Sequence, residues 1–250
     1  MMNQVGSTPS SNRYDRFMRK RAAAAGSVSG ASDPVRLRHR YETIFSRNRE
    51  LFKGARVLDL MSSSGFWSLA ALDAGAAHVV GVEASPAPIE AAKKTFGEYG
   101  VNSGSYRFIN SEIPAALRKF EPKAFDVILC HGFLEQSDPR FFFQQLSRLQ
   151  PKHVVLDTRI VQGKGPIVRL RLRSGDEARQ KAPERYRSIL SIPNHDLITF
   201  FCDYFQLRWR LIDWKATGIT DWTGIGDYEQ DRRRTYVLER AAADPAARAR

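Results

Sequence analysis

The chain has 250 residues, 42% of them hydrophobic, and a formal net charge of +12 at pH 7. This length suits one α/β domain with added segments rather than two complete domains, and the apolar fraction is enough to build a sizeable core. No apolar run reaches the roughly 18 residues that a membrane span needs. Residues 1–32 show no secretory pattern. Cys130 and Cys202 lie far apart in apolar segments, so we expect reduced thiols in a cytoplasmic protein.

Part of the positive charge lies in segments that we expect to be tails. Residues 1–32 are rich in small and polar residues around a short basic run, which predicts a disordered basic tail, and residues 241–250 predict a second, flexible tail. Arg169 and Arg171 alternate with apolar residues, as on one face of a strand. Such charge is compatible with solvated faces or with a nucleic-acid surface. The charge leaves nucleic acid open as a partner, although the sequence shows no RNA-binding motif with interleaved aromatic residues.

Short apolar runs and helical segments alternate along the first two thirds of the chain. Asp33-Pro34 predicts the start of a helix over residues 33–53, with the aspartate as cap and the proline in the first turn. Strands are predicted over residues 56–60, 78–82, 105–110, 125–130 and 152–158, with helices over 66–75, 85–99 and 138–149. This alternation predicts an α/β fold with a doubly wound, mostly parallel sheet. Right-handed crossovers then bring the carboxyl ends of the strands to one edge, where ligands bind in such folds.

The pattern is less regular after Asp157. Residues 160–190 are expected to form an insertion or lid that contains an amphipathic strand over 166–173. Asn194 is the expected cap of a further helix. Residues 206–214 and 234–239 predict a sixth and a seventh strand, which completes a domain over residues 33–240.

One stretch, from Ala55 to Glu83, combines a strand, a small-residue turn, a helix, a second strand and a terminal acid. The turn Ser62-Ser63-Ser64-Gly65 allows a ligand to approach the backbone, and amides at the following helix start can hold an anionic group. A carboxylate at Glu83 can accept hydrogen bonds from both hydroxyls of a ribose. These features indicate a nucleotide-binding βαβ unit. The Gly-x-Gly-x-x-Gly pattern of dinucleotide folds is absent.

This stretch resembles the first two motifs of class I S-adenosylmethionine-dependent methyltransferases. Their pattern is hydrophobic-hydrophobic-Asp-hydrophobic-Gly-x-Gly-x-Gly, followed by an acid at the end of the second strand. Asp59 and Gly65 match the pattern and Glu83 fits it, whereas Met61 and Ser63 occupy the first two glycine positions. The loop is therefore either a modified working loop or a decayed one. The resemblance extends over residues 54–238 and implies a Rossmann-like, seven-stranded sheet whose last strand is antiparallel.

The resemblance also implies S-adenosyl-L-methionine as the cofactor and places its contacts at the strand ends. Glu112 falls where the family has an acid that contacts the adenine amino group. The complete set of candidate cofactor-binding residues is Asp59, Met61, Ser62, Ser63, Gly65, Glu83, Ala84, Glu112, Ile113 and Cys130.

The segment from Phe125 to Pro139 is similar to the family's fourth-strand segment, which walls the reacting centre. Methyl transfer from a sulfonium to an oxygen is an in-line displacement that depends on orientation and on exclusion of water. A hydroxyl acceptor also gains from a base of near-neutral pKa, for which His131 is the first candidate and Glu135 the second. The alternative for His131 is a neutral side chain in the pocket wall. Asp157 either orients a substrate hydroxyl or caps the following turn.

Three functions follow from these residues. The first is an S-adenosylmethionine-dependent methyltransferase acting on a hydroxyl of a small molecule or glycoside, because the last stretch of the chain is similar to small-molecule and glycolipid O-methyltransferases. The second is an RNA or protein methyltransferase, and the third is a catalytically inactive, methyltransferase-like binding protein. The aromatic side chains of Trp214, Trp222 and Tyr228 are equally compatible with core packing and with binding of a sugar. No metal-ligand spacing is present, so no metal is predicted. A homodimer is left open.

Overall fold

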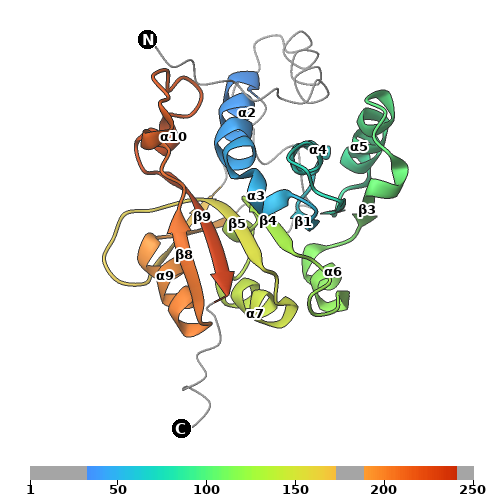
Figure 1. Ribbon diagram of the computed structural model, residues 1–250. Helices are drawn as coiled ribbons and strands as arrows, with labels where there is room; N and C mark the ends of the chain where they lie inside the picture. Colours follow the sequence, from blue (N-terminus) through green and yellow to red (C-terminus); the bar gives the residue numbers. More distant parts are fainter. Residues whose placement is uncertain (1–32, 173–188, 241–250) are drawn as a thin grey trace.

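The computed structural model describes residues 33–172 and 189–240. Seven strands form one sheet in the order β3-β2-β1-β4-β5-β9-β8 (Figure 1). Strands β1 to β5 are parallel, whereas β9 runs antiparallel to both β5 and β8. The predicted seven-stranded, mostly parallel sheet with an antiparallel last strand is confirmed. The strands are β1 Arg56–Leu60, β2 His78–Glu83, β3 Tyr106–Asn110, β4 Val127–His131, β5 His153–Arg159, β8 Leu207–Leu211 and β9 Arg233–Arg240.

Helices cover both faces of the sheet because successive buried residues of the parallel strands point to opposite sides. Val57 of β1 packs in a core with the N-terminal helices, α4 Phe66–Asp73 and α5 Pro86–Glu98. Its neighbour Leu58 packs in a second core with α6 Ile113–Lys119, α7 Pro139–Leu149 and α9 His195–Tyr204. The sheet is therefore doubly wound, as expected.

The segment predicted as a helix over residues 33–53 is helical over residues 34–52 but is not α-helical throughout. It consists of α2 Pro34–Arg40, a π-helical turn Tyr41–Phe45, a 3₁₀ turn Ser46–Asn48 and α3 Arg49–Phe52. Asp33 caps α2, because its Oδ1 accepts a hydrogen bond from the Val35 backbone N–H at 2.9 Å. Wide turns of this kind occur mostly as single turns inside α-helices, and frequently at functional sites. Here the turn lies directly between Arg40 and Ser46.

A two-stranded antiparallel sheet stands beside the main one. It pairs β6 Val168–Leu172 with β7 Ile189–Pro193, so the strand expected in the insertion is present. Asn194 caps α9 by accepting from the Leu197 N–H at 2.9 Å. The predicted tails (1–32 and 241–250) and residues 173–188 of the predicted insertion lie outside the described residues. Among the residues that are described, no helix is long and apolar enough to cross a bilayer.

Candidate functional site

The loop between β1 and α4 has an unusual backbone at the three positions where the methyltransferase pattern carries glycine. Met61, Ser63 and Gly65 have φ angles of 59°, 49° and 73°. A left-handed conformation costs a residue with a side chain roughly 1–2 kcal/mol. Gly65 is also tightly enclosed, since a Cβ there would lie 2.9 Å from Cζ of Phe108. The backbone of the loop therefore has the left-handed conformation that glycine favours at all three positions, although two of them carry Met61 and Ser63.

Glu83, at the end of β2, fastens this loop to the neighbouring strand. Its Oε2 accepts from the Ser63 N–H at 3.1 Å, and its Oε1 accepts from the Ser85 N–H at 3.0 Å. A carboxylate oxygen has two lone pairs, so each oxygen can accept one more hydrogen bond. The side chain is only partly buried and can reach a ligand above the loop.

Two buried polar atoms, Asp59 Oδ1 in β1 and Ser62 Oγ in the loop itself, have no hydrogen-bond partner within the described chain. The other carboxylate oxygen, Asp59 Oδ2, accepts from Ser68 Oγ at 2.7 Å. Burial raises the pKa of Asp59 to about 7. Unpartnered buried polar atoms are rare because each costs free energy. Their place here, at a strand-end loop, fits a ligand that carries a hydrogen-bond donor.

The remaining cofactor candidates differ in accessibility. Glu112 and Ala84 are exposed, whereas Ile113 is the buried first residue of α6. The segment before α6 lies against the end of β2, because the Ser111 N–H donates to the Glu83 carbonyl oxygen at 3.0 Å. Cys130 packs in the second core, and burial raises the pKa of its thiol well above the usual range. Its side chain is therefore part of the core rather than of the strand-end edge.

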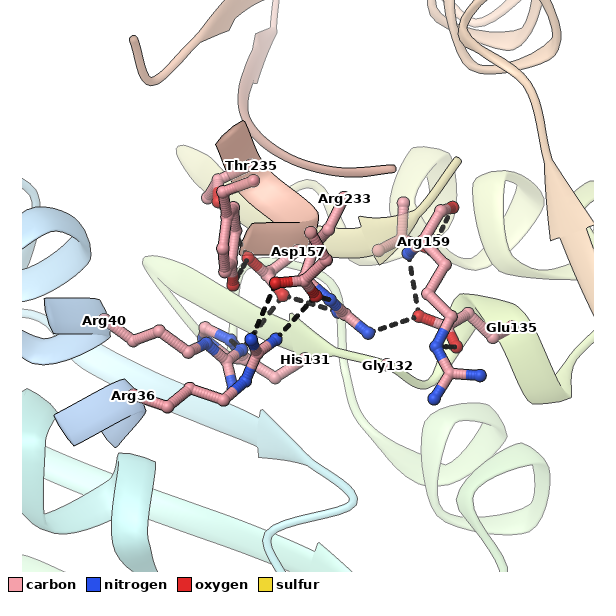
Figure 2. Close-up of polar contacts among 12 residues, drawn as sticks. Arg36, Arg40, His131, Gly132, Glu135, Asp157, Arg159, Arg233 and Thr235 are labelled. Carbon is pink, nitrogen blue, oxygen red and sulfur yellow. Dashed lines mark hydrogen bonds and ion pairs between the residues drawn. The ribbon is translucent and has the colours of Figure 1, made fainter. Parts of the chain in front are cut away.

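His131 ends β4 and is held by Arg40 from the N-terminal helix (Figure 2). Arg40 Nη2 donates to His131 Nδ1 at 3.0 Å, so the proton of the neutral imidazole is assigned to Nε2. Burial and the positive charge of Arg40 lower the pKa of His131 to about 3. Its Nε2 is buried and has no partner within the described chain. In this state the ring donates, rather than accepts, at Nε2.

Two aromatic rings form a wall around this histidine. The His131 ring stacks on Trp67 with centroids 5.1 Å apart and on Phe45 with centroids 5.9 Å apart. The Arg40 guanidinium lies over Trp67, 4.5 Å from the ring centroid. Trp67 belongs to the first turn of α4, directly after the β1 loop, while Phe45 ends the π-helical turn. The wall therefore joins the loop to the end of β4.

Asp157 of β5 lies opposite His131 and is completely buried. Its Oδ1 accepts from Arg40 Nη2 at 2.9 Å and from Arg233 Nη1 at 2.7 Å. Its Oδ2 accepts from the hydroxyls of Tyr228 and Thr235, each at 2.7 Å. Burial alone would raise the pKa of this carboxyl, but Arg40 and Arg233 outweigh it and hold the pKa well below its usual range. These four hydrogen bonds use all the acceptor positions of the carboxylate.

Arg233 connects Asp157 to two further carboxylates. Glu135, also buried, accepts from Arg233 Nη2 at 3.1 Å and from the Arg159 N–H at 2.8 Å through the same Oε1. Asp227 accepts from Arg233 Nε at 3.2 Å and forms a bidentate pair with Arg36 at 2.7 and 2.8 Å. We call the whole set the arginine cluster: Arg36, Arg40, Arg159, Arg233, Glu135, Asp157 and Asp227. Within the described ranges, no group of His, Cys, Asp or Glu side chains has the arrangement of a metal site.

The late aromatic residues divide between the core and its margin. Trp214 and Tyr228 are buried and stack with centroids 3.8 Å apart, and Trp214 Nε1 donates to Thr235 Oγ1 at 3.2 Å. Trp222 is partly buried and packs against the same core. For Trp214 and Tyr228 the structure thus favours core packing. Tyr228 donates a hydrogen bond to Asp157 directly, and Trp214 contacts Asp157 through the hydroxyl of Thr235.

Comparisons with known proteins agree with this geometry. Residues 57–152 match a family model described as a methyltransferase domain. A search of curated protein sequences gives no significant match. The class I methyltransferase resemblance seen in the sequence is confirmed over the matched residues, which run from β1 through α7.

Solved structures with the same fold include several methyltransferases. An S-adenosylmethionine-dependent methyltransferase from Mesorhizobium loti is 13% identical, with a TM-score of 0.57 over 82% of this chain and 100% of that one. Magnesium protoporphyrin IX methyltransferase from Synechocystis PCC 6803, with S-adenosylmethionine bound, is 14% identical, with a TM-score of 0.55 over 96% and 100%. The [4+2]-cyclase SpnF is 15% identical, with a TM-score of 0.54 over 92% and 94%. The sheet therefore has the methyltransferase fold, which also carries another named activity.

Proposed function

We propose, on the premise that residues 57–152 form a methyltransferase domain, that this chain moves a methyl group from S-adenosyl-L-methionine to a hydroxyl of a small molecule or glycoside. The observation that carries the proposal is the backbone of the β1 loop. Met61, Ser63 and Gly65 all have the positive φ angles that glycine favours. Two residues with side chains are held here in a conformation that costs free energy. Such strained residues cluster at functional sites, and a decayed loop is expected to relax. This supports a modified working loop over a decayed one.

The residues around the loop fit the chemical groups of this cofactor. Glu83 has two lone pairs left for a ribose diol, and Glu112 can accept from an adenine amino group. The unpartnered Asp59 Oδ1 and Ser62 Oγ suit the ammonium and carboxylate of an amino acid moiety. Ile113 is buried in the second core beside the same edge. When bound, the cofactor supplies a methyl group that is already activated on a sulfonium, so the chain's own task is to orient an acceptor and exclude water.

His131 is assigned the orienting task in this proposal. Because Arg40 occupies Nδ1 and the imidazole is neutral, Nε2 presents a proton to an acceptor oxygen. The hydrogen bonds thus favour a positioning donor over a base of near-neutral pKa. Trp67 and Phe45 exclude water from the same place. As the oxygen–methyl bond forms and the sulfur–methyl bond breaks, the hydroxyl proton passes to water on the side of the acceptor that Trp67 and Phe45 do not cover.

Glu135 and Asp157 serve as positioning residues in this scheme. Both are buried and are engaged by arginines, and Asp157 has no acceptor position left for a substrate hydroxyl. Their charges fix Arg40 and Arg233, and Arg40 in turn fixes the tautomer of His131. Glu135 and Asp157 therefore act on the acceptor through the arginine cluster.

Two alternatives are supported by particular observations. The net charge of +12 favours an RNA or protein methyltransferase. The side chain of Met61 favours an inactive binding protein, because Gln136 Nε2 lies 3.3 Å from its sulfur and the contact spans from the β1 loop to the segment after β4. That contact lies at the ligand edge of the sheet, where a bound cofactor has to displace or share it.

Calorimetric titration with S-adenosylmethionine and with S-adenosylhomocysteine tests the proposal. Micromolar binding of both compounds is expected, and it would justify a search for acceptors by following S-adenosylhomocysteine release. If neither compound binds, the methyltransferase activity is ruled out and the inactive alternative is supported. Binding of both without turnover on hydroxyl compounds, together with methylation of RNA or protein, would instead support the second alternative.

A further inference from the structure

A cavity of about 670 Å³ lies next to the arginine cluster, at the carboxyl end of β5. It is bounded by Arg159 at the end of β5 and residues 160–162 after it, by residues 169–171 of β6, by Ile192 of β7 and by Asp227 and Arg232 before β9. This volume is within the range of about 300–1,000 Å³ that is typical of small-molecule sites. The cavity adjoins the proposed acceptor region through Arg159 and Asp227, which both belong to the arginine cluster.

The cavity carries more positive than negative charge. Arg159, Arg169, Arg171 and Arg232 line it, whereas Asp227 is its only acidic residue among the described lining residues. Asp227 is already paired with Arg36 and Arg233, and Arg159 is paired with Glu135. No ion pair is present between Arg169, Arg171 or Arg232 and a carboxylate in the described parts of the chain. Within the described residues, these three guanidinium groups are exposed and have no carboxylate partner.

Apolar side chains complete the lining of the cavity. Ile160 and Ile192 are buried behind it, and Leu170 of β6 is 67% exposed at its margin. A guanidinium group matches planar carboxylates and phosphates with two parallel hydrogen bonds. The lining as a whole thus suits a molecule with an anionic group and an apolar part, rather than a neutral sugar.

We propose that this cavity binds the anionic group, a carboxylate or a phosphate, of the small-molecule methyl acceptor, through Arg169, Arg171 and Arg232. That the bound molecule is a methyl acceptor rests on the proposed function, whereas the binding of an anion in this cavity does not depend on it. Arg159 links this site to Glu135 and so to the arginine cluster. An acceptor anchored here is held on the side of the sheet edge where His131 ends β4 beside Asp157 of β5.

Anion binding is measured by calorimetry without S-adenosylmethionine, using inorganic pyrophosphate as the phosphate probe and citrate as the carboxylate probe. At least one probe is expected to bind the full chain with a dissociation constant below about 1 mM. The triple variant Arg169→Ala/Arg171→Ala/Arg232→Ala is expected to bind at least about tenfold more weakly, since each charge-assisted hydrogen bond is worth about tenfold or more. Preference for pyrophosphate or for citrate then identifies which anionic group the site takes.

A control variant removes the same charge from the opposite edge of the sheet. Lys94, Arg107 and Lys119 are exposed on α5, β3 and α6, and their replacement by Ala lowers the net charge by the same three units. The control is expected to bind the probes within about threefold of the wild type, because charges more than a Debye length of about 8–10 Å away are screened. Equal losses in the two triple variants would overturn the site, since the binding would then follow overall charge.

Two further titrations separate this inference from the proposed function. If S-adenosylmethionine binds but neither anion binds the wild type, the anion site is overturned and the proposed function is not. If an anion binds at the cavity but S-adenosylmethionine does not bind, the anion site stands and its role in a methyl acceptor is overturned. A ten-nucleotide single-stranded RNA is the third probe. If the triple variant Arg169→Ala/Arg171→Ala/Arg232→Ala binds only the RNA more weakly than the wild type does, the arginines form a nucleic-acid surface and the small-anion site is overturned.

Discussion

The carboxylate of Asp157 is the best place to test whether the arginine cluster exists as described. In the Asp157→Asn variant the side chain keeps its shape but loses its charge, which leaves Arg40 and Arg233 without the carboxylate that they share. Removing one partner of a buried ion pair costs roughly 3–5 kcal/mol of unfolding free energy. For a chain of this size 1 kcal/mol corresponds to about 2–4 °C, so the Tm is expected to fall by about 6–20 °C.

Thermal denaturation at several pH values gives a sharper form of the same test. The folded-state pKa of Asp157 lies below its unfolded value, so its stabilising contribution is present above about pH 4 and is lost as the pH falls toward the folded-state pKa. The gap between the wild type and the Asp157→Asn variant is therefore expected to narrow below about pH 4.

Asp126→Asn is the matched control for this experiment. Asp126 also contacts two basic residues, Arg56 and Lys152, but their side chains are 54% and 73% exposed. Exposed ion pairs are worth about 0–1 kcal/mol, so only a small change in Tm is expected. If Asp157→Asn costs no more than Asp126→Asn at pH 7, the cluster is hydrated in solution and the reasoning about a buried network is refuted.

Three further predictions concern the loop, the ribose site and His131. Glu83→Ala is expected to weaken S-adenosylmethionine binding by roughly 1.5–3 kcal/mol through loss of a charged acceptor, measured by calorimetry; unchanged affinity, or an equal loss in the exposed control Glu90→Ala, would remove Glu83 from the site. Gly65→Ala and Gly100→Ala both place a side chain at positive φ, but only at Gly65 does the new Cβ meet other atoms, so Gly65→Ala is expected to cost about 1–3 kcal/mol more in thermal denaturation. Similar losses would show that the packing around Gly65 is looser than described. Burial and Arg40 lower the pKa of His131 to about 3, so its ring signal in a nuclear magnetic resonance titration is expected to stay constant from pH 5 to 8; an inflection in that range would restore His131 as a base.

The fold could be predicted from the sequence because its signals are local. Short runs such as 125–130 are apolar throughout, which is typical of a parallel strand buried on both faces, and Asp33, Asp138 and Asn194 mark helix starts through hydrogen bonds to residues two or three positions later. Each of these patterns depends on a few neighbouring residues. The helix expected over 33–53 is helical over 34–52, but its change to a π-helical and then a 3₁₀ turn was not predicted, since nothing in its apolar positions distinguishes a π-helical turn from an α-helical one.

The arginine cluster could not be predicted in the same way because its members come from four distant segments. The pairing of β4 with β5 brings His131 beside Asp157, Arg40 reaches both from α2, and Arg233 joins them from a strand that pairs antiparallel with β5. One signal was available, however. Arg40 lies three residues after Leu37 and four before Ile44, on the apolar stripe of its helix, where a buried charge needs a carboxylate partner.

The distribution of arginines also changes what the net charge of +12 means. Arg40 is buried, the side chain of Arg233 is only 10% exposed, and carboxylates neutralise both charges, so they contribute little to long-range attraction. Arg169, Arg171 and Arg232 are exposed around one cavity, where positive charge concentrates the field more than the same charge spread over a surface does. A total charge describes long-range attraction, whereas recognition depends on which guanidinium groups are left without carboxylates. Among the described residues, Arg169, Arg171 and Arg232 are three such groups that gather around one space of small-molecule size, and this is the ground on which we propose a small anionic acceptor rather than a nucleic acid.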